Sequence, residues 1–310
     1  MRIHYMLSMP GDPTGVSGLV DRAVRAEKDG FAGVWLPQVA SVDALMVLAI
    51  AGRETSRIEL GTAVVPTYPR HPTVLASQAL TVQDASNNRL ALGIGLSHRV
   101  AIEDSLGLDY SKPIPHTREY LTVMNGLLAG ERVSFEGELY RVAAQVAVAG
   151  TTKPPVLVAA LGPAMLKLCG RLADGTITWM GGVPFIRDTA VPTMSAAAKA
   201  AGRPEPRFVA MVPVLRSASI TEARDQLNSS YQNYGRLPSY RATLDRGGAQ
   251  NPADVAVMGS DADIDAGLAE FEAAGVTDFV AVIHREAGGI DETTYEAMAA
   301  RARTLNGWAR

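Results

Sequence analysis

A regular alternation of short apolar runs and longer amphipathic stretches extends along the 310-residue chain. The apolar runs lack the polar alternation of a strand with one solvent-exposed face, which is typical of parallel strands buried on both faces. Eight strands are predicted on this basis, at Ile3–Leu7, Gly33–Leu36, Ile58–Val65, Arg89–Ile94, Val156–Ala160, Gly175–Trp179, Phe208–Leu215 and Asp278–Ile283. Helices are predicted between most of the strands and after the last one, at Val16–Asp29, Asp43–Thr55, Thr73–Ala85, Arg118–Leu128, Ala164–Leu172, Phe185–Ala201, Ile220–Tyr234, Asp263–Ala274 and Asp291–Leu305.

Alternating strands and helices indicate right-handed βαβ units and a parallel sheet. Eight units fit a closed barrel better than an open doubly wound sheet, because the turn at residues 9–13 is not the Gly-rich turn that follows the first strand of a dinucleotide-binding sheet. We therefore predict an α/β fold in which residues 1–310 form a single (β/α)8 TIM-barrel domain. Insertion segments are predicted after strand 4 and before strand 8.

The two insertions differ in character. The first is the connection Ser97–His116, followed by a helix and by a hairpin at Val133–Val142 with Gly137 at its tip. The second, Gly235–Met258, is rich in Gly, Pro and Asn, and we expect it to be irregular. Because long loops in a compact domain are usually functional or disordered, both are expected to line a pocket at the carboxyl ends of the strands.

Composition excludes several kinds of partner and site. A net charge of −3 without a basic cluster argues against nucleic acid or an anionic membrane as partner. Cys169 is the only cysteine, which excludes an internal disulfide and a thiolate metal centre, and its position within a predicted helix indicates packing. The sequence shows no signal peptide, no uninterrupted apolar run of membrane-spanning length and no hydrolase or metal motif, so we expect a cytoplasmic protein without a metal.

Two features near strand ends are compatible with either a site or a purely structural role. Gly93 and Gly95 would let a ligand approach the backbone closely, and His98 follows the same strand, where barrels place catalytic groups. A lone histidine is also often structural or solvated. Trp179 ends another strand, where it would either cover a flat ligand or belong to the core.

The turn Ala160–Ala164 joins a strand to the start of a helix. Free backbone N–H groups and the positive end of the helix make such a turn suitable for a phosphate. Taken alone, the turn is more typical of an ordinary connection that contains a glycine. The Pro-rich segment 66–72 after the third strand is equally ambiguous, because its prolines also end the strand and begin the next helix.

As an ordered set, these segments resemble the luciferase-like monooxygenase superfamily, and specifically its oxidoreductases that depend on the deazaflavin coenzyme F420. The order and spacing are similar over residues 1–180 and more loosely to the end. The matching stretches are Gly33–Leu36, Arg57–Thr62, Arg70–Pro72, Leu92–Gly95, Gly126–Glu131, Phe135–Gly137, Leu161–Pro163 and Ala173–Gly175.

The resemblance implies a TIM barrel, commonly a homodimer, with a flavin-like ring at the carboxyl ends of the strands. It also implies a non-prolyl cis peptide at Ala63-Val64 behind the ring and a cofactor phosphate at the turn Ala160–Ala164, which favours the binding interpretation of that turn. The cofactor-binding residues predicted in this way are Ala63, Val64, Val65, Leu96, Ser97, Ala160, Leu161, Gly162, Pro163, Ala164 and Trp179.

The chain departs from the family pattern at two acid–base positions. Many deazaflavin members carry Asp-His after the second strand, where this chain has Pro37-Gln38, and the sugar-phosphate dehydrogenases place Glu where His98 stands. A sugar-phosphate reaction is therefore not expected. His98 becomes the predicted proton carrier and Gln38 its hydrogen-bonding helper.

The function implied is hydride transfer between F420 and an unidentified small organic substrate. Two alternatives remain open: an FMN-dependent monooxygenase that uses reduced flavin and O2, and a flavin-binding protein without turnover.

Overall fold

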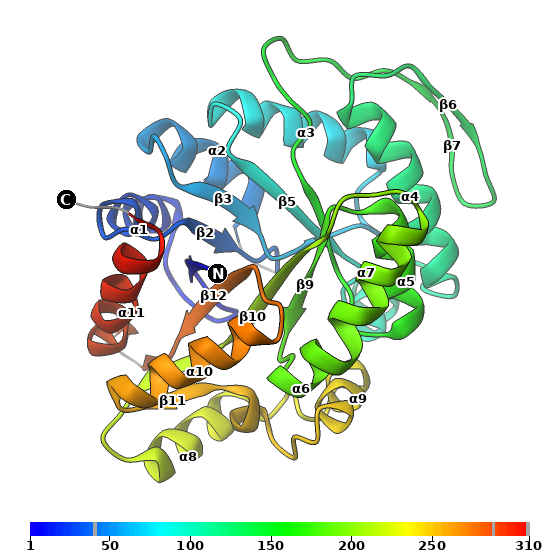
Figure 1. Ribbon diagram of the computed structural model, residues 1–310. Coiled ribbons are helices and arrows are strands. Elements are labelled where there is room, and N and C mark those ends of the chain that lie inside the picture. The colour runs from blue at the N-terminus through cyan, green and yellow to red at the C-terminus, as the bar shows by residue number, and fades with distance from the viewer. Residues whose placement is uncertain (40–41, 287–288, 308–310) are drawn as a thin grey trace.

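The computed structural model describes residues 1–39, 42–286 and 289–307, in which eight parallel strands form a closed barrel inside a ring of helices (Figure 1). Strand β10 pairs with both β9 and β12, and β12 pairs with β1, so the sheet closes on itself. The predicted barrel is confirmed. Its strands are β1 (Arg2–Met6), β2 (Gly33–Leu36), β3 (Glu59–Thr62), β5 (Leu90–Gly95), β8 (Val156–Ala159), β9 (Gly175–Trp179), β10 (Arg207–Arg216) and β12 (Asp278–Ile283).

The main helices lie outside the barrel and start at residues that suit a helix N-terminus. Side chains of Asp43, Ser219, Ser260 and Asp291 accept backbone N–H groups at four of these starts, and proline opens several others. None of the described helices is long and apolar enough to cross a membrane. The helices are α1 (Val16–Lys28), α2 (Ala44–Glu54), α3 (Pro72–Ala85), α4 (Pro113–Leu128), α5 (Pro163–Leu172), α7 (Val191–Ala200), α8 (Ile220–Tyr231), α10 (Asp261–Ala273) and α11 (Glu292–Leu305).

Alternate residues of each strand belong to two hydrophobic clusters. On β1, Ile3 and Tyr5 pack in the outer cluster between strands and helices, whereas Met6 packs in the inner cluster inside the barrel. Trp35 fills the inner cluster and is completely buried. Because both faces are covered, the strands read as continuous apolar runs in the sequence.

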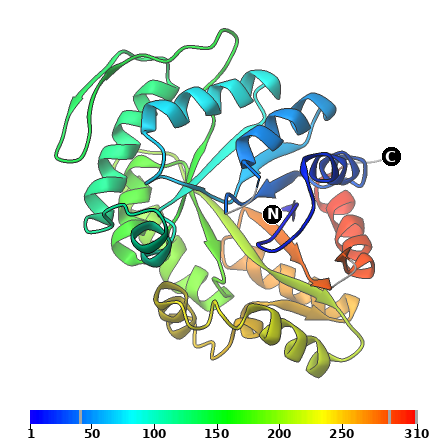
Figure 2. The same ribbon diagram turned by 180° about the vertical axis from the view of Figure 1, so that it is seen from behind.

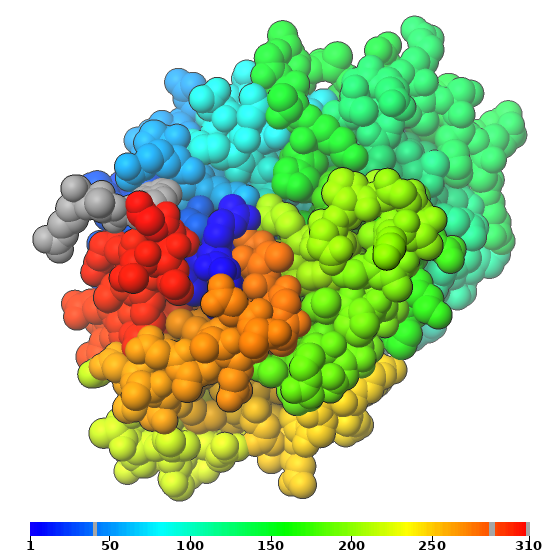
Figure 3. Space-filling view, in the orientation of Figure 1, coloured from blue at the N-terminus to red at the C-terminus, as the bar shows by residue number. Residues whose placement is uncertain are grey.

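The two ends of the chain meet on one face of the barrel. The amino group of Met1 lies 2.5 Å from a carboxylate oxygen of Glu272 on α10, and Asn306, which follows α11, accepts the N–H of Ile3 at 3.2 Å. In Figure 3 the first residues (dark blue) accordingly lie between α11 (red) and the segment containing α10 and β12 (orange). This face carries the amino ends of the strands.

The first insertion is shorter than predicted. Helix α4 begins at Pro113 because proline suits the first turn of a helix, and the loop before it contains a π-helical turn at Ala101–Ser105. The predicted hairpin is confirmed as β6 (Val133–Glu136) and β7 (Arg141–Ala144). The predicted helix Phe185–Ala201 begins earlier, as α6 (Val183–Phe185), and passes through a π-helical segment before α7.

The prediction that Gly235–Met258 is irregular is wrong. This segment forms helix α9 (Pro238–Arg246), a 3-10 turn at Pro252–Val255 and strand β11 (Val257–Gly259), which extends the sheet beyond β10. Its prolines open two helical segments rather than prevent them. Helix α8 packs against the 3-10 turn and β11, and α9 packs against α6, so the two helices occupy different parts of the same side of the barrel (Figure 1 and Figure 2). Two short pairs complete the strands, β4 (Val65–Pro66) against β5, and β13 (Arg285–Glu286) against β14 (Gly289–Ile290).

Candidate active site

The third barrel strand is interrupted at its carboxyl end. The peptide bond Ala63-Val64 is cis, as the resemblance implied, and separates β3 from β4. Ala63 and Val64 are half-buried and pack against the inner cluster. The interruption therefore presents a small apolar surface at the mouth of the barrel.

Gly93 and Gly95 make room for this bulge rather than for a ligand. A Cβ on Gly93 would lie 1.9 Å from the carbonyl oxygen of Thr62, and one on Gly95 would lie 2.6 Å from Cγ2 of Val64. The hydroxyl of Thr62 also donates to the carbonyl of Gly93 at 2.7 Å. The close approach of two strands explains both glycines.

The turn after β8 leaves the start of helix α5 open. Gly162 is the N-cap in an extended conformation, and no side chain caps the helix. A Cβ on Gly162 would have no heavy atom within 4 Å, and Pro163 and Ala164 are exposed. The first N–H groups of a ten-residue helix, and its positive dipole end, are thus directed toward accessible space.

Trp179, at the end of β9, is part of a group of aromatic side chains whose other members come from the end of α8, the turn after it and α9. Its ring lies edge-on to Tyr231 at 5.6 Å and to Tyr234 at 5.4 Å, and Tyr234 meets Tyr240 of α9 at 5.2 Å. We call Trp179, Tyr231, Tyr234 and Tyr240 the aromatic wall. Edge-to-face geometry is the arrangement that aromatic pairs prefer.

His98 meets the far end of the aromatic wall. Its half-buried imidazole lies edge-on to Tyr240, with ring centroids 5.6 Å apart. Ser97 precedes it with a φ of 61°, and this left-handed residue turns the chain after β5. Burial lowers the pKa of His98 from 6.5, so its ring is neutral at pH 7.

Gln38 supports the loops around the bulge. Its side-chain oxygen accepts the N–H of Ala44 at the start of α2 at 2.7 Å. The backbone N–H of Gln38 donates to the carbonyl of Val64 at 3.3 Å. The side-chain oxygen is therefore held by the protein, and the amide nitrogen is the part of Gln38 that remains for a ligand.

The predicted residues fall into two groups. Ala63, Val64 and Trp179 meet in the inner cluster, and His98 reaches it through Tyr240 and Tyr234. Residues at the outer edge pack instead against the cluster between strands and helices, and these are Val65, Leu96, Ala160 and Leu161.

The three tyrosines of the aromatic wall were not predicted from the sequence. A compositional signal was present, because three of the nine tyrosines in the chain lie within residues 231–240.

A second aromatic group beyond the bulge was also missed. Tyr68 stacks on His116 with ring centroids 4.0 Å apart, and the hydroxyl of Thr67 lies 2.8 Å from Nε2 of the same histidine. Burial lowers the pKa of His116 to about 4. A neutral imidazole with partners on both ring nitrogens, the second being the Tyr140 hydroxyl, is a structural element of this loop.

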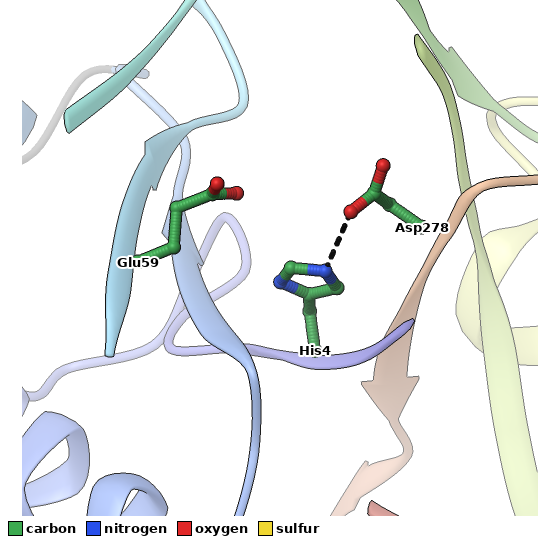
Figure 4. A group of neighbouring side chains, drawn as sticks. All are labelled: His4, Glu59 and Asp278. Carbon is green, nitrogen blue, oxygen red and sulfur yellow. Dashed lines mark hydrogen bonds and ion pairs between the residues drawn. The ribbon is translucent and has the colours of Figure 1, made fainter. Parts of the chain in front are cut away.

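At the opposite end of the barrel, His4, Glu59 and Asp278 lie on three different strands with their ligand atoms within 4.8 Å of one another (Figure 4). The carboxylates already have cationic partners, because Arg207 binds Glu59 at 2.8 Å and Asp278 at 3.1 Å, and Arg2 pairs with Asp278. His4 meets Asp278 at 2.9 Å. We interpret these five side chains as a structural ion cluster at the amino ends of the strands.

Known proteins share this sequence and fold. The F420-dependent glucose-6-phosphate dehydrogenase of Nakamurella multipartita is 34% identical over 216 residues, which cover 65% of this chain and 63% of that protein. The structure of the coenzyme F420-dependent tetrahydromethanopterin reductase of Methanopyrus kandleri has a TM-score of 0.76 at 21% identity and covers 96% of this chain and 97% of its own.

A further structure has a TM-score of 0.78 at 16% identity and covers 99% of this chain and 98% of its own. It is the FMN complex of the oxygenating constituent of 3,6-diketocamphane monooxygenase from Pseudomonas putida. At these identities, the two solved structures show that the fold is shared.

The family comparison spans nearly the whole molecule. The model described as luciferase-like monooxygenase matches residues 1–304, which include all eight barrel strands and both insertions. The resemblance seen in the sequence is confirmed at this level, and the chain belongs to the luciferase-like monooxygenase family.

Proposed function

We propose that this protein is an oxidoreductase that transfers a hydride between coenzyme F420 and a small organic substrate. One observation carries the proposal: an apolar bulge at Ala63 and Val64 and an open helix start at Gly162 occur in a chain whose relatives include F420-dependent enzymes. The bulge follows β3 and the helix start follows β8, so both lie at the carboxyl ends of barrel strands. Enzymes of this fold bind their ligands at that end of the barrel.

The residues present fit a deazaflavin with a ribityl phosphate. Backbone N–H groups at the start of α5 suit the phosphate, and the open space beside Gly162 admits it, with Leu161 and Ala164 on either side. Ala63 and Val64 offer one apolar surface for the ring, and Trp179 offers another. Ser97 and Leu96 border the same mouth after β5.

When bound, the deazaflavin supplies a ring carbon that carries the hydride. The chain must then position the substrate, exclude water and move a proton. The inner cluster provides a water-poor surface, and the neutral imidazole of His98 is suited to accept a proton when a substrate is oxidised. The side-chain amide nitrogen of Gln38, whose oxygen already accepts the N–H of Ala44, is the proposed hydrogen-bond donor to the substrate.

An FMN-dependent monooxygenase is the second candidate. Both cofactors present a ribityl phosphate, so the turn at Gly162 suits either. The shared fold of the FMN-bound diketocamphane monooxygenase supports this alternative.

Separate titrations of the purified protein with F420 and with FMN test the proposal. We expect F420 to bind at least about tenfold more tightly, a difference of about 1.4 kcal/mol. Quenching of cofactor fluorescence measures both affinities. Equal or tighter binding of FMN would overturn the F420 assignment.

We further propose that the protein acts as a homodimer. Large apolar side chains are exposed on the two adjacent helices α2 and α3: Met46 is 69% exposed, Ile50 46% and Val74 51%. These two helices pack together, so the three side chains contribute to one apolar surface. A second copy of the chain is the partner that we propose for it.

A further inference from the structure

The aromatic wall offers ring surfaces to the mouth of the barrel. Tyr234 and Tyr240 are half-buried and keep some accessible surface, whereas Trp179, which meets Tyr234 edge-on, is 8% exposed. Met9 and Met258, also partly buried, pack against the same inner cluster. The accessible surface is therefore made of aromatic rings and thioether side chains, which favour flat apolar groups.

Two of the arginines beside the wall, Arg241 and Arg224, are already bound within the protein, whereas Arg236, between Tyr234 and Tyr240 in the chain, is exposed and donates to the uncharged side chain of Gln232 at 3.4 Å. Arg241 of α9 donates to Asp245 at 2.9 Å and to the carbonyls of Ala249 and Gln250 at 2.6 and 2.7 Å, so all its nitrogens have acceptors. Arg224 of α8 pairs with Asp254. An anionic substrate pressed against the buried part of the wall would therefore lose hydration without gaining Arg241 or Arg224 as a cationic partner.

We infer that the substrate is an uncharged molecule that carries a flat ring, and that Tyr234 and Tyr240 bind this ring beside Trp179. The inference rests on the proposed function for the position of the cofactor, and it adds the chemical class of the second ligand. His98 lies at the Tyr240 end of the wall, so a substrate held there also lies near the proposed proton carrier.

Three ketones of matched size test the substrate class: acetophenone, which is flat and neutral; 2-octanone, which has the same number of carbons without a ring; and 4-acetylbenzoate, which adds a carboxylate to acetophenone. Each is titrated by calorimetry into the protein saturated with F420. We expect acetophenone to bind at least about tenfold more tightly than 4-acetylbenzoate, because the carboxylate would be desolvated without a partner. We also expect about fivefold tighter binding of acetophenone than of 2-octanone, the size of one aromatic contact.

Substitutions that remove a ring but keep apolar volume test the residues. Tyr234→Leu and Tyr240→Leu should each weaken acetophenone binding about fivefold and leave 2-octanone within about twofold. Tyr240→Phe retains the ring and should bind acetophenone like the parent. Tyr140→Leu removes a half-buried tyrosine that contacts His116 and should change neither affinity.

Deazaflavin fluorescence, measured on every variant, separates this inference from the proposed function. If F420 does not bind the parent protein, the proposed function fails. If F420 binds but 4-acetylbenzoate or 2-octanone binds as well as acetophenone, or none of the ketones binds, the substrate class is wrong. Equal losses for acetophenone and 2-octanone in the leucine variants would reduce the tyrosines to a structural role.

Discussion

Burial sets the charge of His98 and therefore the direction in which it is able to move a proton. With its pKa below 6.5, the imidazole is neutral at pH 7 and ready to accept a proton. We predict that His98→Ala lowers turnover in the direction of substrate oxidation by about 10²–10⁴-fold, the usual contribution of a general base. Single-turnover absorbance of F420 measures this rate. F420 affinity should stay within about threefold, because the helix start at Gly162 and the bulge remain.

The pH dependence of this rate gives an independent test of His98. In the parent enzyme the rate should fall as the pH drops below 6.5 and through the lowered pKa, because the protonated imidazole no longer accepts a proton. His98→Gln should lack this acid limb. A His98→Ala enzyme with nearly parental turnover would remove the residue from the mechanism and leave Gln38 as the next candidate.

Individual residues were predictable from the sequence only where their neighbours in the chain set their role. Gly162 was predicted because it lies between a strand and a helix and because the family resemblance places a phosphate there, and His98 because it follows a strand. Tyr240 was missed, since its contact with His98 joins positions 142 residues apart (240 − 98) and leaves no local pattern. The roles of Gly93 and Gly95 were misread for the same reason, because what they approach is a neighbouring strand.

Among the structural elements, the start of α5 yields a test in which stability and binding change in opposite directions. Gly162 has the extended backbone of an N-cap, and serine is a preferred N-cap residue because its hydroxyl accepts a free N–H. Gly162→Ser should therefore raise the free energy of unfolding by a few tenths of a kcal/mol. It should weaken F420 binding, because the hydroxyl occupies N–H groups that the phosphate needs. Urea unfolding and fluorescence titration measure the two effects.

Gly162→Val complements the serine variant. Its side chain fits without a clash in the protein alone, since a Cβ at this position has no neighbour within 4 Å. It should nevertheless obstruct the phosphate, so the variant should fold and bind F420 more weakly by about tenfold or more. If the folded valine variant binds F420 as tightly as the parent, the turn does not bind the phosphate and is an ordinary connection.

At the level of elements, the sequence was most informative for the strands and least for the second insertion. Continuous apolar runs such as residues 279–283 indicate strands buried on both faces, and their short length distinguishes them from a buried helix. Helix α9 was missed because its nine residues bury few side chains and are flanked by proline and glycine, which usually indicate a loop. Its i,i+4 pair Arg241–Asp245 is a helical signal, although a weak one.

Considered as a whole, the molecule has an ion cluster at the amino ends of its strands and, at the carboxyl ends, the site that we propose for binding. Burial alone would raise the pKa of Asp278, but the side chains of His4, Arg207 and Arg2 outweigh it and hold that pKa well below its usual range. Glu59 has a lowered pKa as well: burial opposes the shift, and the charge of Arg207 overcomes it. These carboxylates are therefore ionised in the folded state at neutral pH.

We predict that Asp278→Asn lowers the free energy of unfolding by about 3 kcal/mol, because it removes the buried carboxylate that Arg207, Arg2 and His4 share. The lowered pKa stabilises the fold above the ordinary value of 3.8, and this contribution is lost as the pH falls toward the folded-state pKa. Urea unfolding of the parent should thus weaken between about pH 5 and pH 3, with a smaller slope in the variant. Asp188→Asn, which removes an exposed ion pair with Arg187, is the matched control and should change neither quantity. If the stability of Asp278→Asn falls as steeply with pH as that of the parent, the acid sensitivity does not come from Asp278.

The proposed dimer has a direct test at the surface of α2. Met46→Glu places a charge at the most exposed of the three apolar side chains on α2 and α3, where it would be desolvated in an interface. Light scattering coupled to gel filtration should show a dimer for the parent and a monomer for the variant. Glu222→Lys on α8 alters an exposed charge elsewhere and should leave the mass unchanged. A parent protein that is monomeric at micromolar concentration would rule out this interface.

The pairing of β1 with β12 has a consequence for how the protein is made. Arg2 is in register with Asp278, so the first strand to leave the ribosome must wait for nearly the last. At about 5–20 residues per second, that delay is tens of seconds. Until β12 closes the barrel, inner side chains such as Trp35 and Ile177 lack some of the neighbours that bury them in the folded protein. Until β12 is made, we expect the nascent chain to be a partly open sheet with an unpaired edge, a state that is prone to aggregation.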